Sequence, residues 1–389
     1  MSNNGYLGKT SIGVLILKAG QLEAVPPLLT VRVPRNGRLI FVLKKRYSRY
    51  INGGGTPMIY AFGEVMMRLE APHFQKLQQA SELLVSYSGT GVNILSGLSH
   101  FGHRTALVTK LPTNSIGIAA LAHLQSLGIE TSHIVRGGDT LGLYFLERGF
   151  GGRASAVTYT DRSNSSFCTS ECEEYDFANL QKSSVIHFCG ISLAVSSHTR
   201  QLTLAVAKKA KAQGLTISFD CNYRPKLWGD DSTHAKSSYE EMLHLADICF
   251  MTEKDARFIL ELPTTQTEKE KQIEDLLPQV ADAYKIQTIA GTIRDTTSIS
   301  AQTLKGFIVR EGTVTYSHVH NLHVLDRIGG GDGFVSGILH GLHTKVEPNN
   351  LIDFATAAGV LAHTTVGDSP VSSLADIKRF TEQTIDIER

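Results

Sequence analysis

The sequence predicts an α/β fold in which a doubly wound domain carries a small β-sheet that projects as a lid. Two observations support this prediction. Short apolar segments, of the kind that form buried parallel strands, alternate with segments of helical spacing along most of the chain. Two extended segments near the middle break this alternation and are joined by a glycine-rich turn, which is typical of a hairpin.

The alternation begins with residues 59–69 (IYAFGEVMMRL), which predict a strand that runs into a second extended segment. Helical spacing follows at 91–102, and a strand at 104–111. The next helix is expected at 116–128, where Gly128 would close it, because glycine readily takes the left-handed conformation found at helix C-termini.

The hairpin comprises residues 141–148 and 155–160, and beyond it the alternation resumes. Short apolar segments predict parallel strands, and the segments between them predict helices: strands at 184–190, 215–220 and 247–251, helices at 198–213 and 235–246. We expect the hairpin to join the extended segment near residue 65 in a separate sheet. The lid would then come from about 64–90 and 141–160.

The composition suits a soluble globular protein with a large core, since 42% of the 389 residues are hydrophobic. Basic and acidic side chains number 38 and 37, which gives no reason to expect a nucleic acid or membrane partner. Five cysteines without a framework spacing argue for the reducing cytoplasm rather than for disulfides. Cys168 and Cys172 have no second pair at ligand spacing, which argues against a zinc site.

Residues 1–57 differ in charge from the rest of the chain. They hold nine Lys or Arg residues and one acidic residue, Glu23, whereas the remainder holds 29 basic and 36 acidic side chains. Their two apolar runs are too short to cross a bilayer, and residues 53–57 (GGGTP) are typical of a linker. We therefore expect residues 1–57 to be a basic segment that is a true extension, a vector leader or the result of an upstream mis-start, and residues 58–389 to form the folded domain.

Three consecutive glycines stand directly before Asp332 in residues 326–334 (DRIGGGDGF). Neither the dinucleotide-binding pattern nor the Walker A pattern fits this segment. Helical spacing begins after the glycines, so their N–H groups would lie at the positive end of a helix, which suits an anion. Asp332 would then be either a base that removes a hydroxyl proton or the cap of its own helix, and these nine residues favour neither.

Further along this predicted helix, glycines recur every four residues, at Gly333, Gly337 and Gly341. A stripe without side chains lets a neighbouring helix come close. We expect a tightly packed helix pair at this position.

Several segments together resemble the ribokinase-like (PfkB-type) carbohydrate kinases. DRIGGGD is similar to their C-terminal signature D-T-x-G-A-G-D, and SGTGVN (88–93) is similar to their N-terminal signature G-G-x-x-x-N. Within that family, four segments resemble the 2-keto-3-deoxygluconate kinases: FGEVMMRL (62–69), residues 141–167, FDCNYRPKLW (219–228) and HTTVGD (363–368). The resemblance extends from Met58 to about Asp368.

The resemblance implies a three-layer ribokinase-like fold and ATP-dependent phosphorylation of 2-keto-3-deoxygluconate at its terminal hydroxyl. It also implies ATP and Mg²⁺ as cofactors and allows a homo-oligomer that pairs through the lid. Two alternatives stay open. One is a neutral-sugar kinase of the fructokinase or ribokinase type, and the other is a catalytically weak sugar-sensing homologue.

The same resemblance assigns roles in phosphoryl transfer and in sugar binding. Asp332 matches the catalytic base, and Gly329, Gly330 and Gly331 match the anion hole. The sugar contacts it implies comprise the cleft floor, two lid tyrosines and two arginines for the substrate carboxylate: Gly89, Asn93, Tyr144, Tyr159, Arg162 and Arg224. Without the resemblance, Arg162 beside Asp161 would suggest only a surface ion pair.

For the nucleotide, the resemblance implies contacts from Asn222 and Thr252 to the phosphates, Gly291 over the nucleotide and Thr356 at the adenine. Asp255 would serve Mg²⁺ indirectly. Three positions depart from the family pattern: Ser88 replaces a glycine, Thr252-Glu253-Lys254-Asp255 replaces N-x-x-E, and Arg327 replaces a threonine. The second of these departures puts Asp255, a shorter carboxylate, where the family has a glutamate linked to magnesium and phosphate.

Overall fold

The structure, a computed structural model, describes residues 30–32, 40–42, 57–182, 184–296 and 302–382. The chain divides into two compact units, 1–56 and 57–389. In the first unit the described residues are two short antiparallel strands, β1 (Thr30–Arg32) and β2 (Ile40–Val42). Apart from Pro57, the rest of the basic segment lies outside the described residues.

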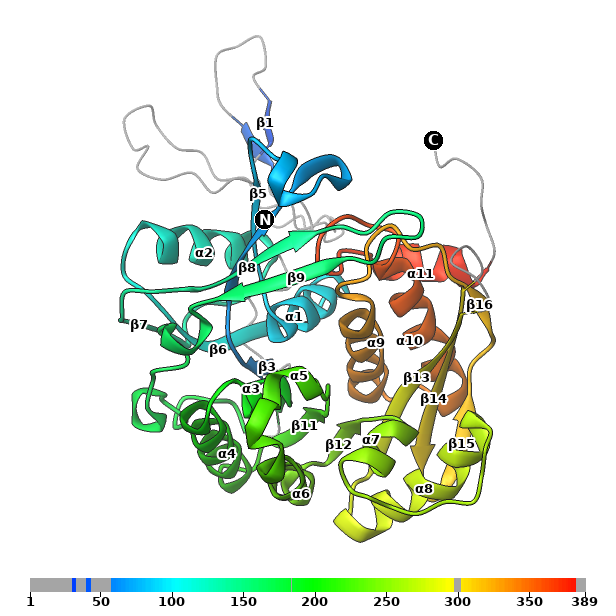
Figure 1. The fold of residues 1–389 in the computed structure, drawn as a ribbon. Helices are drawn as coiled ribbons and strands as arrows, with labels where there is room; N and C mark the ends of the chain where they lie inside the picture. Colours follow the sequence, from blue (N-terminus) through cyan, green and yellow to red (C-terminus); the bar gives the residue numbers. More distant parts are fainter. Residues whose placement is uncertain (1–29, 33–39, 43–56, 183, 297–301, 383–389) are drawn as a thin grey trace, which may run out of the picture. The chain divides into compact units, whose positions relative to one another are not determined.

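A ten-stranded sheet forms the centre of the second unit (Figure 1). Seven neighbouring strands are parallel: β13 (Thr288–Thr296), β12 (Ile248–Phe250), β11 (Thr216–Asp220), β10 (Val185–Cys189), β3 (Ile59–Phe62), β6 (Thr105–Leu111) and β7 (Ile134–Arg136). The remaining three are antiparallel and continue the sheet beyond β13: β14 (Gln302–Arg310), β15 (Thr313–Tyr316) and β16 (His320–Asn321).

Helices cover both faces of this sheet. All four residues of β3 are buried, and successive side chains of a strand point to opposite faces. Tyr60 and Phe62 join one core with α3 (Ile191–Val195), α4 (Ser197–Ala212), α6 (Ala235–Leu245) and α8 (Lys269–Tyr284). Ile59 and Ala61 join another with α1 (Thr90–His100), α2 (Ser115–Ser126), α9 (Gly330–Thr344) and α10 (Pro348–Ala362). The predicted doubly wound α/β class is confirmed.

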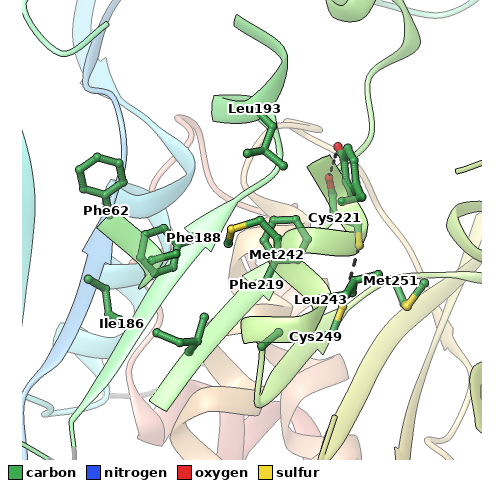
Figure 2. Close-up of a cluster of buried hydrophobic side chains, with 14 of the residues drawn as sticks. Phe62, Ile186, Phe188, Leu193, Phe219, Cys221, Met242, Leu243, Cys249 and Met251 are labelled. Atoms are coloured by element: carbon green, nitrogen blue, oxygen red, sulfur yellow. Dashed lines mark hydrogen bonds between the residues drawn. The ribbon is translucent and has the colours of Figure 1, made fainter. Parts of the chain in front are cut away.

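The first of these cores packs aromatic and aliphatic side chains from neighbouring strands against the helices. Phe188 of β10 and Phe219 of β11 lie beside Met242 and Leu243 of α6 (Figure 2). The five cysteines are buried and free, as the sequence indicates, and the Sγ atoms of Cys221 and Cys249 lie 3.8 Å apart.

The predicted glycine stripe brings α9 and α10 together, and the two helices lie side by side in Figure 1. A Cβ atom at Gly337 would lie 2.5 Å from the Cα of Ala355, and one at Gly341 would lie 2.5 Å from the side chain of Leu351. Any side chain at these positions would therefore force the helices apart.

The small second sheet contains β5 (Leu84–Ser88), β4 (Met66–Glu70), β8 (Gly142–Glu147) and β9 (Ala156–Thr160), in that order. Strands β8 and β9 form the predicted antiparallel hairpin. Every residue of β9 is exposed, whereas β8 alternates between buried and half-buried residues. The hairpin is therefore packed through β8 and open to solvent along β9, which lies at the edge of the sheet.

Shorter helices complete the described fold: α5 (Pro225–Trp228), α7 (Glu253–Phe258) and α11 (Leu374–Thr381). Over the described ranges, every helix is too short or too polar to traverse a lipid bilayer.

Candidate active site

A cavity of about 750 Å³ opens where parallel strands of the central sheet end and the lid strands begin. Its walls include Asp220 at the end of β11 and Phe250 at the end of β12, together with Tyr144 and Tyr159 of the lid. Ligands of open α/β sheets bind at the carboxyl ends of the strands, so the position suits a substrate site. All predicted site residues line this cavity except Gly330 and Thr356.

The three consecutive glycines enter α9, and each has its own surroundings. Gly329 holds the N-terminal capping position at φ +88°, and a Cβ there would lie 1.9 Å from the carbonyl oxygen of Asp368. A Cβ at Gly330 would lie 1.9 Å from the ring of His363, on the side away from the cavity. At Gly331 a Cβ would meet no atom within 4 Å, and this residue lines the cavity. Two glycines thus allow close packing, and the third leaves the backbone open.

Asp332 lies in the first turn of α9, inside the helix, so Gly329 and not Asp332 caps it. Its carboxylate is buried, and Oδ2 accepts a 2.7 Å hydrogen bond from Nδ2 of Asn93 on α1. Burial raises the pKa of Asp332 to about 7, although the Asn93 bond and the charge of Arg224 both act to lower it. A carboxyl group with this pKa can exchange a proton near neutral pH.

A second acid, Asp220, lies beside Asp332, and the sequence analysis missed it. Burial raises its pKa to about 7, and the charges of Asp332 and Asp255 act in the same direction. The residue ends the strand predicted at 215–220, so a signal was present. A carboxylate at the carboxyl end of a parallel strand is a site candidate by position alone.

Both predicted lid tyrosines reach the cavity. The hydroxyl of Tyr144 lies 2.9 Å from Oγ of Ser88 and donates to the carboxylate of Asp368. Burial raises the pKa of Tyr144 to about 12, so it stays a neutral donor. The ring of Tyr159 is 43% exposed, and the guanidinium of Arg162 lies 5.1 Å from its centroid. Tyr144 is therefore held in place by hydrogen bonds, whereas the ring of Tyr159 is partly exposed at the cavity.

Arg162 pairs with Glu64, not with its neighbour Asp161. Its Nε donates to Oε2 of Glu64 at 2.6 Å, and Ser165 donates to the other carboxylate oxygen at 2.9 Å. Burial, the largest single cause, acts to lower the pKa of Arg162, but the charge and hydrogen bond of Glu64, together with Tyr159 and Cys168, outweigh it, and the pKa is raised. Its Nη1 is buried and has no hydrogen-bond partner within the described residues. The guanidinium is thus held at one edge while a donor at the other edge remains unused.

Arg224, the second predicted arginine, follows β11 and lies exposed at the cavity wall. Its Nη1 donates to the carbonyl of Tyr223 at 3.1 Å. Its charge acts to lower the pKa of both Asp220 and Asp332, which places a cation beside the buried acids.

Of the residues predicted to contact the nucleotide, Asn222, Thr252 and Gly291 line the cavity together with Asp255 of α7. Thr252 caps this helix, and Oδ2 of Asp255 accepts from its backbone N at 2.7 Å and from Oγ1 at 3.0 Å. Asn222 takes a left-handed conformation at φ +38°, and its backbone N donates to Asp220 at 3.0 Å. A Cβ at Gly291 would lie 2.6 Å from the carbonyl oxygen of Met251, so only glycine fits there.

Thr356 requires a correction. The sequence analysis expected it at the adenine, but it is fully buried between α10 and β14. Its hydroxyl donates to the carbonyl of Ile352 at 2.7 Å, and a Cβ at Gly306 would lie 2.1 Å from it. Thr356 is therefore a small side chain that lets α10 pack closely against β14 at Gly306.

A buried ion cluster next to the glycines was also missed. The guanidinium of Arg68, on lid strand β4, pairs with Glu70, with Asp326 at 3.1 Å and with Asp368. Asp326 begins the DRIGGGD segment, and the carbonyl of Asp368 packs on Gly329. The lid is thereby joined to both segments that surround the glycines. In the part of the chain that the structure describes, no group of three or more His, Cys, Asp or Glu side chains could hold a metal ion.

Several known proteins that this chain resembles are named as kinases of 2-keto-3-deoxy sugar acids. Two relatives are a 2-dehydro-3-deoxygalactonokinase of Haloferax volcanii, 27% identical over 83% of this chain and 96% of its own, and a 2-dehydro-3-deoxygluconokinase of Bacillus subtilis, 26% identical over 79% and 90%. A solved structure of a candidate 2-keto-3-deoxygluconate kinase from Enterococcus faecalis is 37% identical, with a TM-score of 0.81 over 86% of this chain and 99% of its own.

A 2-dehydro-3-deoxygluconokinase structure from Thermotoga maritima is 29% identical, with a TM-score of 0.79 over 84% of this chain and 99% of its own. The family model for pfkB family carbohydrate kinases matches residues 56–374. With the cavity, the glycines and Asp332 in place, this match means that the chain belongs to the pfkB family of carbohydrate kinases.

Proposed function

We propose that this protein transfers the terminal phosphoryl group of ATP to the terminal hydroxyl of 2-keto-3-deoxygluconate. One observation supports an acid sugar above all: Arg162, which lines the cavity that contains Asp332, has a buried Nη1 without a hydrogen-bond partner among the described residues. A guanidinium fork binds a carboxylate through two parallel hydrogen bonds. The names of the relatives point to the same class of substrate.

In this proposal Asp332 is the catalytic base. Its Oδ2 is engaged by Asn93, so the proton of the substrate hydroxyl would pass to Oδ1. The N–H groups at the start of α9 would stabilise the charge of the transferring phosphoryl group, since Gly331 leaves the backbone open to the cavity. Positioning and charge stabilisation provide most of the catalysis in phosphoryl transfer.

The acid end of the sugar would lie against Arg162 and Arg224, beneath the exposed ring of Tyr159. Arg162 is oriented in advance by Glu64, so little side-chain freedom would be lost on binding. Closure of the lid over this end would exclude water from the phosphoryl group.

Mg²⁺ fits this site only through water or the nucleotide. When bound, Mg²⁺ neutralises phosphate charge, and it commonly keeps several waters and uses one or two carboxylates. Asp255 lines the cavity, but its Oδ2 already accepts two bonds from Thr252. We therefore assign Asp255 a water-mediated contact to the metal.

A coupled assay of ADP release tests the substrate. It should compare 2-keto-3-deoxygluconate, 2-keto-3-deoxygalactonate, fructose and ribose at equal concentrations. The galactonate arm is included because of the Haloferax volcanii relative. We expect the two acid sugars to give the highest kcat/KM. Preference for fructose or ribose would replace the proposal by a neutral-sugar kinase, and no ADP release with any sugar would favour a sensor.

We also propose that residues 58–389 are sufficient for this activity. The residues that line the cavity lie beyond Met58. A chain that begins at Met58 should therefore be folded by circular dichroism and retain the kcat of the full chain. Loss of most of the activity would mean that the basic segment contributes to the fold.

A further inference from the structure

We propose that Ser369 positions the catalytic base by fixing the orientation of the Asn93 amide, through which Asp332 is held. This inference rests on the proposed function, in which Asp332 is the base. Ser369 lies between the HTTVGD segment and α11, and no motif in the sequence pointed to it.

A continuous pair of hydrogen bonds joins Ser369 to the base. Its Oγ donates to Oδ1 of Asn93 at 3.1 Å, and Nδ2 of Asn93 donates to Oδ2 of Asp332 at 2.7 Å. An ionised carboxylate can only accept, so Asn93 must present its NH₂ group to Asp332. A rotated amide would instead place its oxygen against the carboxylate. In the orientation that the carboxylate requires, the amide oxygen faces Ser369, whose hydroxyl donates to it and so holds the amide at its far end.

Both neighbours of Ser369 are anchored, so its own position is fixed before any substrate binds. The carboxylate of Asp368 is held by Arg68 and by the hydroxyl of Tyr144. The carbonyl of Pro370 accepts from Oγ of Ser96 at 2.8 Å, three residues beyond Asn93 on α1. The loop is thus attached to the lid on one side and to the helix of Asn93 on the other.

The surroundings of Asp332 give this arrangement a measurable consequence. Asp220 at the end of β11 and Cys189 at the end of β10 lie within reach of its charge: burial is the main cause that raises the pKa of both, and the Asp332 charge adds to the rise. Burial raises the pKa of Asp332, while Asn93 and Arg224 oppose that rise. Loss of the oriented Asn93 donor would remove one of these two opposing effects. The pKa of the base would rise, and the acid limb of the pH–rate profile would move to higher pH.

The test compares Ser369→Ala, Ser369→Thr and a matched control, Ser99→Ala. Ser99 lies on α1, the helix that carries Asn93. Its hydroxyl donates to the carbonyl of Gly128 at 3.2 Å, away from the cavity. For Ser369→Ala we expect kcat at pH 7 to fall about 3- to 10-fold, as for one lost neutral hydrogen bond. The acid limb should move up by about 0.5–1 pH unit, with KM for ATP unchanged. Ser369→Thr should restore both values, and Ser99→Ala should match wild type.

The wild type and Asp332→Asn are measured in the same series, so that two failures can be told apart. No sugar-dependent turnover in the wild type, or normal turnover in Asp332→Asn, would overturn the proposed function itself. If those two behave as expected, a Ser369→Ala enzyme with wild-type kcat would overturn only the role of Ser369. So would a lower kcat without movement of the acid limb, or a threonine variant that restores neither, because a general loss of packing would give those results.

Discussion

Two acids of this cavity, Asp332 and Asp255, each lie in the first turn of a helix but are held in opposite ways. Asp255 closes a capping box with Thr252 at the start of its own helix, α7. Asp332 lies in α9, where Gly329 takes the capping position, and its carboxylate bonds to Asn93 on a different helix. A glycine cap thus leaves the following acid free for chemistry, whereas a threonine cap engages it in local structure.

The largest effect should come from removing each acid in turn. Asp332→Asn keeps the shape and the bond from Asn93 but removes the base, so turnover should fall by about 10²–10⁴-fold. Asp255→Asn keeps an oxygen for Thr252 and should change kcat far less. The measurement is kcat at saturating ATP and sugar for both variants. Comparable losses in the two would mean that the distinction between a free and an engaged acid has no catalytic meaning.

Arg162, which lines the same cavity, allows a second comparison, between a charge and a fork. Arg162→Met removes the guanidinium, and KM for the acid sugar should rise about 10- to 100-fold, as for one charge-assisted hydrogen bond. Arg162→Lys keeps the charge and should recover only part of the loss, because an ammonium cannot form the fork. KM for fructose serves as the reference. An unchanged acid-to-neutral ratio in Arg162→Met would remove the carboxylate assignment.

Much of this fold could be predicted from the sequence because its strands are short, apolar and well separated by helical spacing. The lid hairpin was found for the same reason, since β8 and β9 flank a glycine-rich turn. Strand β5 was not found. Its residues are half-buried or exposed except for Ser88, so apolar periodicity gives little signal there.

The site was predicted less completely, and the omissions share one cause. Glu64, Asp220 and Asp368 act through partners that are distant in sequence: Arg162, Asp332 and Tyr144. Such pairs carry no local spacing. Thr356 shows the reverse error, because a position suggested by resemblance proved to be helix packing. Sequence patterns locate the elements that carry the chemistry, whereas the partners of each side chain depend on the tertiary fold.

The buried carboxyl of Asp332 should also make the stability of the protein depend on pH. The pKa of Asp332 is raised to about 7 in the folded state, from about 3.9 when exposed. An acid whose pKa is raised on folding contributes stability below pH 4, and this contribution is lost as the pH rises through 7. Asn cannot titrate, so the Asp332→Asn variant does not lose this stability. The difference in unfolding free energy, variant minus wild type, should therefore increase between pH 4 and pH 8, by at most about 4 kcal/mol. Calorimetric unfolding at both pH values measures it, and a difference independent of pH would contradict a buried, titrating Asp332.

The smallest effect is expected at the cap of α7. Thr252→Ala removes the hydroxyl that accepts from the backbone N of Lys254 at 3.3 Å and donates to Asp255 at 3.0 Å. Loss of such a cap costs about 1 kcal/mol of stability. Asp255 would then keep only the bond from the backbone of Thr252, which frees part of its carboxylate for a metal or water contact. We therefore expect a slightly lower midpoint of urea unfolding together with a changed Mg²⁺ dependence of kcat. Thr252→Ser, which keeps the hydroxyl, is the control and should match wild type in both measurements. A variant that loses stability but keeps the wild-type Mg²⁺ dependence would mean that Asp255 serves α7 alone and has no part in the chemistry of the cavity.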